Sequence, residues 1–150
     1  MENRIRAMVS SVSKTCAPYC TCGDLGIHGF PHLVQVATTA GLIATELGED
    51  IQSAVVGGFL HDCARTNDAG GRGHAIDSAI LGAWLLGRFF PELDANRKRI
   101  CEAISWHADG KTTNDMLIAC IWDADRLDLK RLHRVIDPRF LSTDVAKRMI

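Results

Sequence analysis

The chain has 150 residues, a length that fits one domain with one hydrophobic core. Its 47 % hydrophobic and 23 % charged residues are typical of a globular protein. The net charge of −1 excludes an overall field that attracts nucleic acid, and no apolar stretch approaches the roughly 20 residues of a membrane span. With no secretory signal at the charged N-terminus, we expect a cytoplasmic protein with no membrane partner and no strong nucleic-acid partner.

The apolar pattern is helical along nearly the whole chain. Apolar residues recur every three or four positions after Pro31, which predicts a helix that begins near Pro31 and ends at Gly48. The period restarts in a second helix from Ile51 to about Cys63, and the two helices are expected to form an antiparallel pair.

Two glycines and one loop stand out in this part of the chain. Gly57 and Gly58 lie inside the second predicted helix, where each costs about 1 kcal/mol relative to alanine. Their presence predicts close backbone contact with a neighbouring element. A glycine-rich loop from Asn67 to Gly73 follows.

The remaining segments also follow a helical period. Further helices are predicted from about His74 to Phe89, from Pro91 through His107, from a cap among Thr112, Thr113 and Asp115 to Asp125, and from Ser142 onward. No segment alternates apolar and polar residues as a strand does. The predicted fold class is therefore all-α, a compact orthogonal helical bundle that forms a single domain over residues 1–150.

Six cysteines in a chain of this size favour free thiols in a reducing compartment over a disulfide framework. Cys16, Cys20 and Cys22 lie close together in the sequence, and with His28 they could supply four zinc ligands. The alternative is a loop with free thiols. Because the Cys-x3-Cys-x-Cys spacing is unusual for zinc, no site is assigned to these residues.

Several histidines and aspartates fall on predicted inward faces of different helices. His32 lies on the apolar face of the first predicted helix, His107 on that of the fourth, and His61-Asp62 ends a strongly apolar helix. Burying these groups without partners costs several kcal/mol, whereas one divalent cation compensates all of them. The mixed nitrogen and oxygen ligands predict Mn, Fe, Co, Ni or Zn, with Mg possible if waters complete the coordination.

These residues resemble the signature of the HD superfamily of metal-dependent phosphohydrolases. The resemblance rests on His32, on His61-Asp62 within Gly-Phe-Leu-His-Asp, and on Asp125 within Asp-Ala-Asp-Arg-Leu-Asp. It covers about residues 28–129 and leaves a short C-terminal extension, and the C-terminal stretch looks like a small, poorly characterised bacterial branch. The resemblance implies an HD-type bundle of at least five helices around one or two divalent ions.

Carried over position by position, the resemblance makes His32, His61, Asp62 and Asp125 the ligands of the first metal. Some branches have two further histidines, which His74 and His107 match. These two would hold a second metal, or else act as proton donors or phosphate contacts.

Three more residues are expected around the ligands. Asp123 is the alternative to Asp125 as a metal ligand. Residues two apart on a helix point about 200° apart, so only one of them can face the ion, and the superfamily motif selects Asp125. Asp123 is then a solvated or capping carboxylate, Asp128 a hydrogen-bond partner of a ligating histidine, and His28 a residue at the pocket mouth.

The resemblance implies hydrolysis of a phosphate ester by a metal-activated water, with a nucleotide or another small phosphorylated metabolite as substrate. Arg65, Arg72 and Lys111 are the predicted phosphate contacts, whereas Arg126 is expected to pair with Asp123 or Asp128. The alternatives are a di-iron oxygenase on the same scaffold and a non-catalytic, metal-organised sensor of small molecules. The sequence makes no prediction of the oligomeric state.

Overall fold

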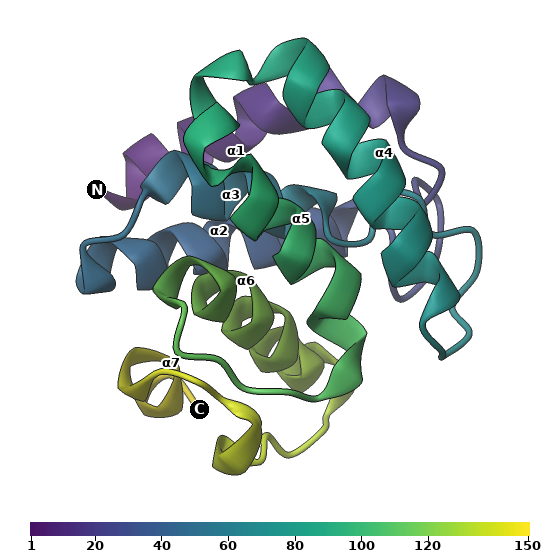
Figure 1. Ribbon diagram of the computed structural model, residues 1–150. Coiled ribbons are helices and arrows are strands. Elements are labelled where there is room, and N and C mark those ends of the chain that lie inside the picture. Colours follow the sequence, from purple (N-terminus) through teal and green to yellow (C-terminus); the bar gives the residue numbers. More distant parts are fainter.

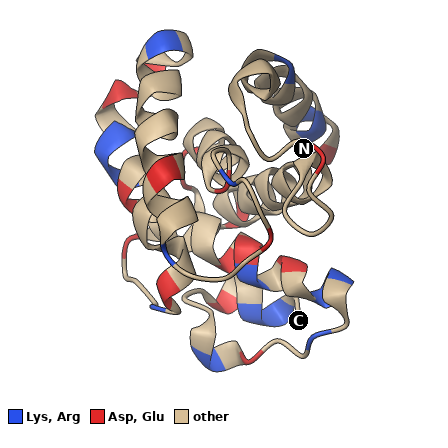
Figure 2. Ribbon diagram, turned by 90° about the vertical axis from the view of Figure 1, so that its right-hand side faces the viewer, with Lys and Arg blue, Asp and Glu red and all other residues tan.

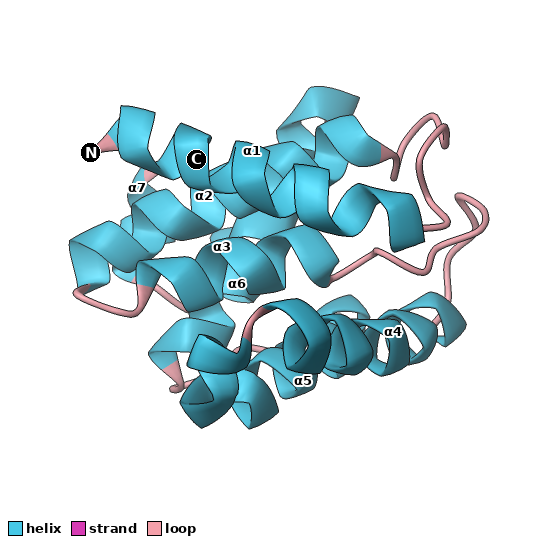
Figure 3. Cartoon of the chain, turned by 90° about the horizontal axis from the view of Figure 1, so that it is seen from above, coloured by secondary structure: helices cyan, strands magenta, loops and turns pink.

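The computed structural model describes residues 1–150 and contains helices without any strand (Figures 1 and 3). The α-helices are α1 (Glu2–Cys16), α2 (Phe30–Leu47), α3 (Ile51–Leu60), α4 (Gly73–Phe89), α5 (Arg97–Trp106), α6 (Met116–Leu127) and α7 (Asp144–Arg148). Short 3-10 segments connect several of them. The predicted all-α bundle is therefore confirmed.

Helix α3 lies at the centre of the bundle and packs against α1, α2, α5 and α6 (Figure 1). Eight of its ten residues are buried. Asp50 caps its first turn by accepting a hydrogen bond from the backbone N–H of Ser53 at 2.7 Å. Because α3 crosses the interior, the His61-Asp62 pair that follows its last residue emerges inside the molecule, with both residues almost fully buried.

Two glycines allow the close packing of α3, as the sequence predicts. A Cβ atom at Gly58 would lie 3.0 Å from the Cα of Ala37 in α2, and one at Gly57 would overlap the side chain of Ile121 in α6. The backbone of α3 can therefore approach both neighbours, which brings the three helices together next to His61.

The predicted helix boundaries differ from the structure at several ends. Pro91 opens a 3-10 segment, Pro91–Asn96, and α5 begins only at Arg97. The cap of α6 is Asp115, which accepts from the N–H groups of Leu117 and Ile118. The predicted stop at Gly48 is confirmed by its left-handed conformation, with φ of 70°.

The first helix, α1, has no counterpart among the sequence expectations. Its buried residues are Ile5, Val9, Val12 and Cys16, which recur at helical spacing and pack onto the core formed by α2 and α3. The same period that revealed the other helices is therefore present here.

The loops before α2 and after α3 are joined by hydrogen bonds, and loops collect at one edge of the bundle (Figure 3). Thr21 donates from its N–H to the carbonyl of Cys63 and from its hydroxyl to that of Arg65, each at 3.0 Å. His28 hydrogen-bonds Asp68 at 2.8 Å.

None of the helices has the length and apolar character that crossing a membrane requires.

Candidate metal centre

Four side chains from α2, α6 and the turn after α3 converge at the end of α3. The Nε2 atoms of His32, at the start of α2, and His61 lie 3.0 Å apart. Asp125, near the end of α6, places Oδ1 3.3 Å from both of these nitrogens. Asp62 Oδ2 lies 3.6 Å from His61 Nε2 and 3.8 Å from His32 Nε2. The four residues expected from the resemblance as ligands of the first metal therefore come together.

The other carboxylate oxygen of Asp62 faces a second pair of histidines. Its Oδ1 lies 3.2 Å from His107 Nε2 and 3.5 Å from His74 Nε2. His74 stands in the first turn of α4, and His107 follows α5. One buried carboxylate thus lies between two groups of imidazoles, an arrangement that suits two ions sharing Asp62.

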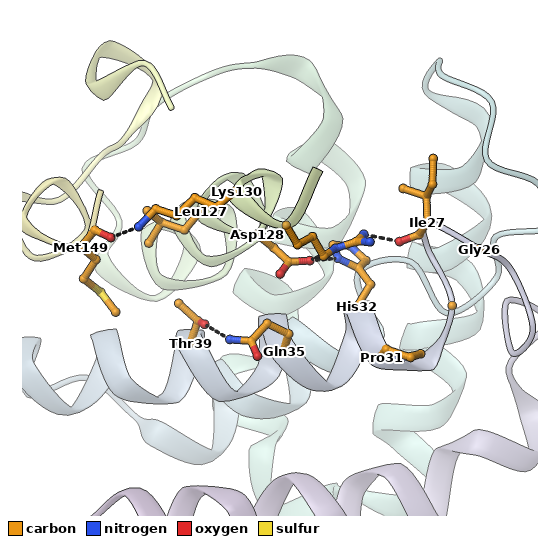
Figure 4. A pocket seen from close by; sticks show the side chains of 12 residues that line it. Gly26, Ile27, Pro31, His32, Gln35, Thr39, Leu127, Asp128, Lys130 and Met149 are labelled. Atoms are coloured by element: carbon orange, nitrogen blue, oxygen red, sulfur yellow. Dashed lines mark hydrogen bonds and ion pairs between the residues drawn. The ribbon is translucent and has the colours of Figure 1, made fainter. Parts of the chain in front are cut away.

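Three of these imidazoles have their Nδ1 atoms engaged by the protein. His61 Nδ1 donates to the carbonyl of Gly58 at 2.7 Å, and His107 Nδ1 donates to that of Ile104 at 2.8 Å. His32 Nδ1 donates to Asp128 at 2.6 Å, and Figure 4 shows these two side chains pointing toward one another. With the Nδ1 proton fixed, each neutral ring turns the lone pair of Nε2 toward the centre, as metal-ligating histidines do.

The electrostatics of the centre favour bound positive charge. Burial alone would raise the pKa of Asp62, but His61 and His107 outweigh it and hold that pKa below its usual range. Burial likewise opposes protonation of His32, yet the carboxylates of Asp125 and Asp128 raise its pKa to about 9. The carboxylates therefore stay ionised, and the metal-free centre takes up a proton.

The residues present fit a divalent metal. Two buried Nε2 atoms at 3.0 Å repel each other unless a proton or a metal ion lies between their lone pairs. Imidazole nitrogens together with carboxylate oxygens form the set that Mn, Fe, Co, Ni and Zn prefer. Three groups of at least three such atoms occur in the centre, and they are His32–His61–Asp62, His61–His107–Asp125 and Asp62–His74–His107.

A polar cleft of about 520 Å³ opens onto the centre. Besides the metal-facing residues, its walls include Arg65, Arg72 and Arg134. Arg65 is 5 % exposed and lies 3.4 Å from Asp62, while its other nitrogens donate to the carbonyls of Asn67 and Ala69. Arg65 thus fixes the loop beside the centre, and Arg72 and Arg134 are the more accessible cations.

Two of the predicted phosphate contacts stack on the same aromatic ring. The guanidinium of Arg72 lies 3.6 Å from the ring centre of Trp106, and Lys111 Nζ lies 4.2 Å from it. Arg72 also pairs with Asp109 at 3.4 Å. Trp106 was not among the expected functional residues, although it immediately precedes His107 in the sequence.

The structure places the three surrounding residues in different settings. Asp128 holds His32 and also accepts a hydrogen bond from Arg131 Nε at 2.6 Å. His28 lines the cleft but bonds to Asp68. Asp123 is completely buried and contacts none of the histidines, so the expectation of a solvated carboxylate is wrong. It accepts instead from the N–H of Ser142 and from the N–H and hydroxyl of Thr143, the two residues that precede α7.

His32 and Asp128 also line a separate cavity of about 500 Å³ (Figure 4). Arg131 is a further residue of its wall. Arg131 also donates to the carbonyl of Ile27, so it bridges α2's leading loop and the segment after α6. Arg131 belongs to a C-terminal segment rich in Lys and Arg, which gives the blue positions near the C-terminus in Figure 2. Its spacing of three from Asp128 was the available signal.

The six cysteines are free thiols. Because His28 bonds to Asp68, it does not join Cys16, Cys20 and Cys22 in a zinc site. Cys63 comes close to these thiols instead, and burial raises the pKa of the Cys16 thiol to about 12. No group of three thiols lies close enough together to hold a metal.

Comparison with known proteins gives one family match and a set of curated relatives. The family model described as HD domain matches residues 29–133, more than half of the chain. Ribonuclease Y of Geobacter sulfurreducens is 29 % identical over 128 residues, covering 69 % of this chain and 23 % of the relative. Ribonuclease Y of Thermus thermophilus is 32 % identical over 100 residues, covering 67 % and 16 %.

Ribonuclease Y of Thermosipho melanesiensis is 38 % identical over 60 residues, which cover 39 % of this chain and 11 % of the relative. The chain thus spans less than a quarter of the length of these three relatives. No solved structure matches the chain.

Proposed function

The chain belongs to the HD-domain family, and from that premise we propose that it hydrolyses a phosphate ester with the help of one or two divalent ions. The observation that carries the proposal is the placement of Asp62 between two groups of imidazole Nε2 atoms, at 3.2–3.8 Å. Several buried imidazole nitrogens and carboxylate oxygens point toward the same place in this arrangement. Burying them together is costly without a cation, so the arrangement suits ion binding.

His32, His61, Asp62 and Asp125 would hold the first ion. His74 and His107, with the second oxygen of Asp62, would hold another. Burial lowers the pKa of His74 to about 4, so this imidazole is neutral near pH 7 and is poorly suited to donate a proton. The second-metal role is therefore preferred for His74 over the proton-donor role.

A divalent ion in this centre supplies Lewis-acid chemistry, because it lowers the pKa of water and neutralises charge on a phosphoryl group. The protein itself contributes positioning. Arg72 and Arg134 on the cleft walls can hold phosphoryl oxygens, and Arg72 is kept in place by Trp106 and Asp109. Arg65 steadies Asp62 and the loop from Asn67 to Ala69, so it acts mainly by fixing a ligand.

The proposed substrate is a nucleotide, either free or as part of an RNA strand. A free nucleotide or small phosphorylated metabolite follows from the sequence analysis, and the near-neutral net charge of −1 favours it over a long polyanion. The relatives named Ribonuclease Y support an RNA strand. The assay therefore includes both kinds of substrate.

The experiment begins with chelator-treated protein of residues 1–150 reloaded with Mn²⁺, Fe²⁺, Co²⁺, Ni²⁺, Zn²⁺ or Mg²⁺. Phosphate or nucleotide release is then measured from bis-p-nitrophenyl phosphate, nucleoside monophosphates, cyclic dinucleotides and a short RNA. We expect metal-dependent hydrolysis that His61→Ala and Asp62→Asn abolish. The matched control is His133→Asn, because His133 is exposed and has the left-handed backbone that asparagine tolerates.

Two other outcomes favour the alternatives. A pair of ions sharing Asp62 also suits a di-iron oxygenase, for which we would expect oxygen consumption and near-ultraviolet absorption of the iron-loaded protein without phosphate release. Metal binding without any turnover across the whole panel would favour a metal-organised sensor. Either result would contradict the proposed hydrolase.

A further inference from the structure

A second cavity of about 420 Å³ adjoins the metal centre on the side of the C-terminal segment. It shares five wall residues with the polar cleft, and these are His107, Ala108, Asp125, Leu129 and Arg134. The two hollows therefore meet at a common wall beside the candidate ligands. One small molecule can occupy both, with a phosphoryl group at the metal centre and the rest of its structure in the second cavity.

The second cavity differs from the cleft in its chemistry. Its apolar wall residues include Leu129, Val135, Ile136 and Phe140. Val135 is 96 % exposed and Phe140 49 % exposed, so apolar surface is left uncovered next to a charged centre. Pockets that combine apolar walls with a few polar groups are typical of sites for small organic ligands.

One buried arginine in the wall of this cavity has a donor without a partner. Arg126 is only 8 % exposed, and its Nη1 donates to the carbonyl of Phe140 at 2.6 Å. Its Nη2 is buried with no hydrogen-bond partner, and it is the single such side-chain atom in the protein. The expected ion pair with Asp123 or Asp128 does not form, since both carboxylates bond to other groups.

An unpartnered donor in a buried guanidinium is costly. Because Arg126 lines the cavity, a small turn of its side chain would let a ligand there supply the missing acceptor. A nucleobase fits this description. It has two apolar faces for the walls at Leu129 and Phe140 and carbonyl or ring-nitrogen acceptors on its edge. Arginine is the side chain that most often recognises such acceptors, particularly those of guanine.

We propose that this cavity binds the base of the nucleotide substrate, with Arg126 donating to an acceptor on the base edge. The placement of the phosphate over the metal centre rests on the proposed function, whereas base binding does not. A base with a carbonyl oxygen, such as guanine or uracil, is the expected occupant. It can belong to a free nucleotide or to the terminal nucleotide of an RNA strand.

The test measures equilibrium binding of guanosine, uridine and ribose to the full chain in EDTA by ligand-observed NMR. We expect both nucleosides to bind at least tenfold more tightly than ribose. Arg126→Met should weaken nucleoside binding at least tenfold. Val135→Glu should do the same by placing a carboxylate at the cavity wall, and the exposure of Val135 lets the fold tolerate this change.

Arg139→Met is the matched control, because Arg139 is an exposed arginine of the same segment, pairs with Asp137 and lines neither cavity. It should bind nucleosides as the unmodified protein does. Comparing guanosine monophosphate with a short RNA that ends in guanosine then identifies the source of the base. Tenfold tighter binding of the RNA indicates a strand, and equal affinities indicate a free nucleotide.

Nucleoside binding equal in the unmodified protein, Arg126→Met and Val135→Glu would overturn the proposal. So would a protein that hydrolyses non-nucleotide esters but binds no nucleoside, and that result leaves the proposed function standing. A protein that binds nucleosides through Arg126 but hydrolyses nothing supports the base site and contradicts only the hydrolase.

Discussion

The Nε2 atoms of His32 and His61 lie 3.0 Å apart, although these residues are 29 positions apart in the sequence and each donates its Nδ1 proton to another group. Two neutral imidazoles in this geometry face each other with lone pairs. Only a cation between the two nitrogens removes the repulsion of their lone pairs, and in the metal-free protein that cation is a proton. The ion-binding state and the proton-binding state of this centre therefore compete.

Metal binding should raise the thermal stability of the protein. At 100 times its dissociation constant, an ion that binds only the folded chain adds about 2.7 kcal/mol, which raises Tm by roughly 5–10 °C at this chain length. Calorimetry with and without EDTA measures the shift. His61→Ala should remove it, His133→Asn should retain it, and an unchanged Tm on chelation would contradict the metal centre.

The number of bound ions should depend on Asp62 and His74 in different ways. Asp62 faces both groups of imidazoles, so Asp62→Ala should remove all bound metal, whereas His74→Ala should remove only the second ion. Elemental analysis of protein dialysed with excess metal gives the two stoichiometries. Equal metal content in His74→Ala and the unmodified protein would show that His74 holds no ion.

Asp128 should tune metal affinity through His32 without touching the ion. Its hydrogen bond at 2.6 Å fixes the orientation of the imidazole, so Asp128→Ala should weaken metal binding about 10- to 100-fold. Competition titration with a fluorescent chelator measures the change. Asp144→Ala removes an exposed carboxylate on α7 and should leave the affinity as it is; a comparable loss there would indicate a general charge effect.

The metal-free protein should lose stability as the pH rises above neutrality. Against burial, Asp125 and Asp128 raise the pKa of His32 from 6.5 to about 9. The folded chain thus holds this proton more tightly than the unfolded chain. The resulting stabilisation, on the order of 3 kcal/mol, is complete below about pH 6.5 and disappears as the pH approaches 9. Urea unfolding in EDTA at several pH values tests this, and His32→Asn should flatten the profile.

The close approach of α3 and α2 makes Gly58 sensitive to substitution. A Cβ there would lie 3.0 Å from the backbone of Ala37, so Gly58→Ala should destabilise the fold by about 1–3 kcal/mol despite its better helix propensity. Gly73→Ala is the control, since a Cβ at this first position of α4 meets no atom within 4 Å. Equal denaturation midpoints for the two variants would exclude the packing explanation.

Local periodicity predicts most of the helices because each buries one continuous apolar face. The stripe through Val36 and Ile43 and the stop at Gly48 needed no knowledge of neighbouring elements. The cap at Asp115 and the 3-10 segment at Pro91 are harder to predict from the sequence. Several residues near Asp115 can cap a helix, and a proline fits the first turn of either kind of helix.

The centre shows where sequence reasoning ends. The motif drew attention to His32, His61, Asp62 and Asp125, which the structure brings together. It gave no direction for the two oxygens of Asp62, because that direction depends on how α4 and α5 pack. The unpartnered Arg126 was equally inaccessible to sequence analysis, since its expected partners turn toward other groups only after tertiary packing.

The buried carboxylate of Asp123 shows how much of the chain the folded domain needs. Residues matched by the family end at 133, yet the three donors that satisfy this carboxylate belong to Ser142 and Thr143. Trimming the polypeptide to the matched span would remove all three hydrogen bonds of this carboxylate, which lies in the helix that carries Asp125. The segment that contains Ser142 and Thr143 thus stabilises α6. A polypeptide made for expression should include this segment.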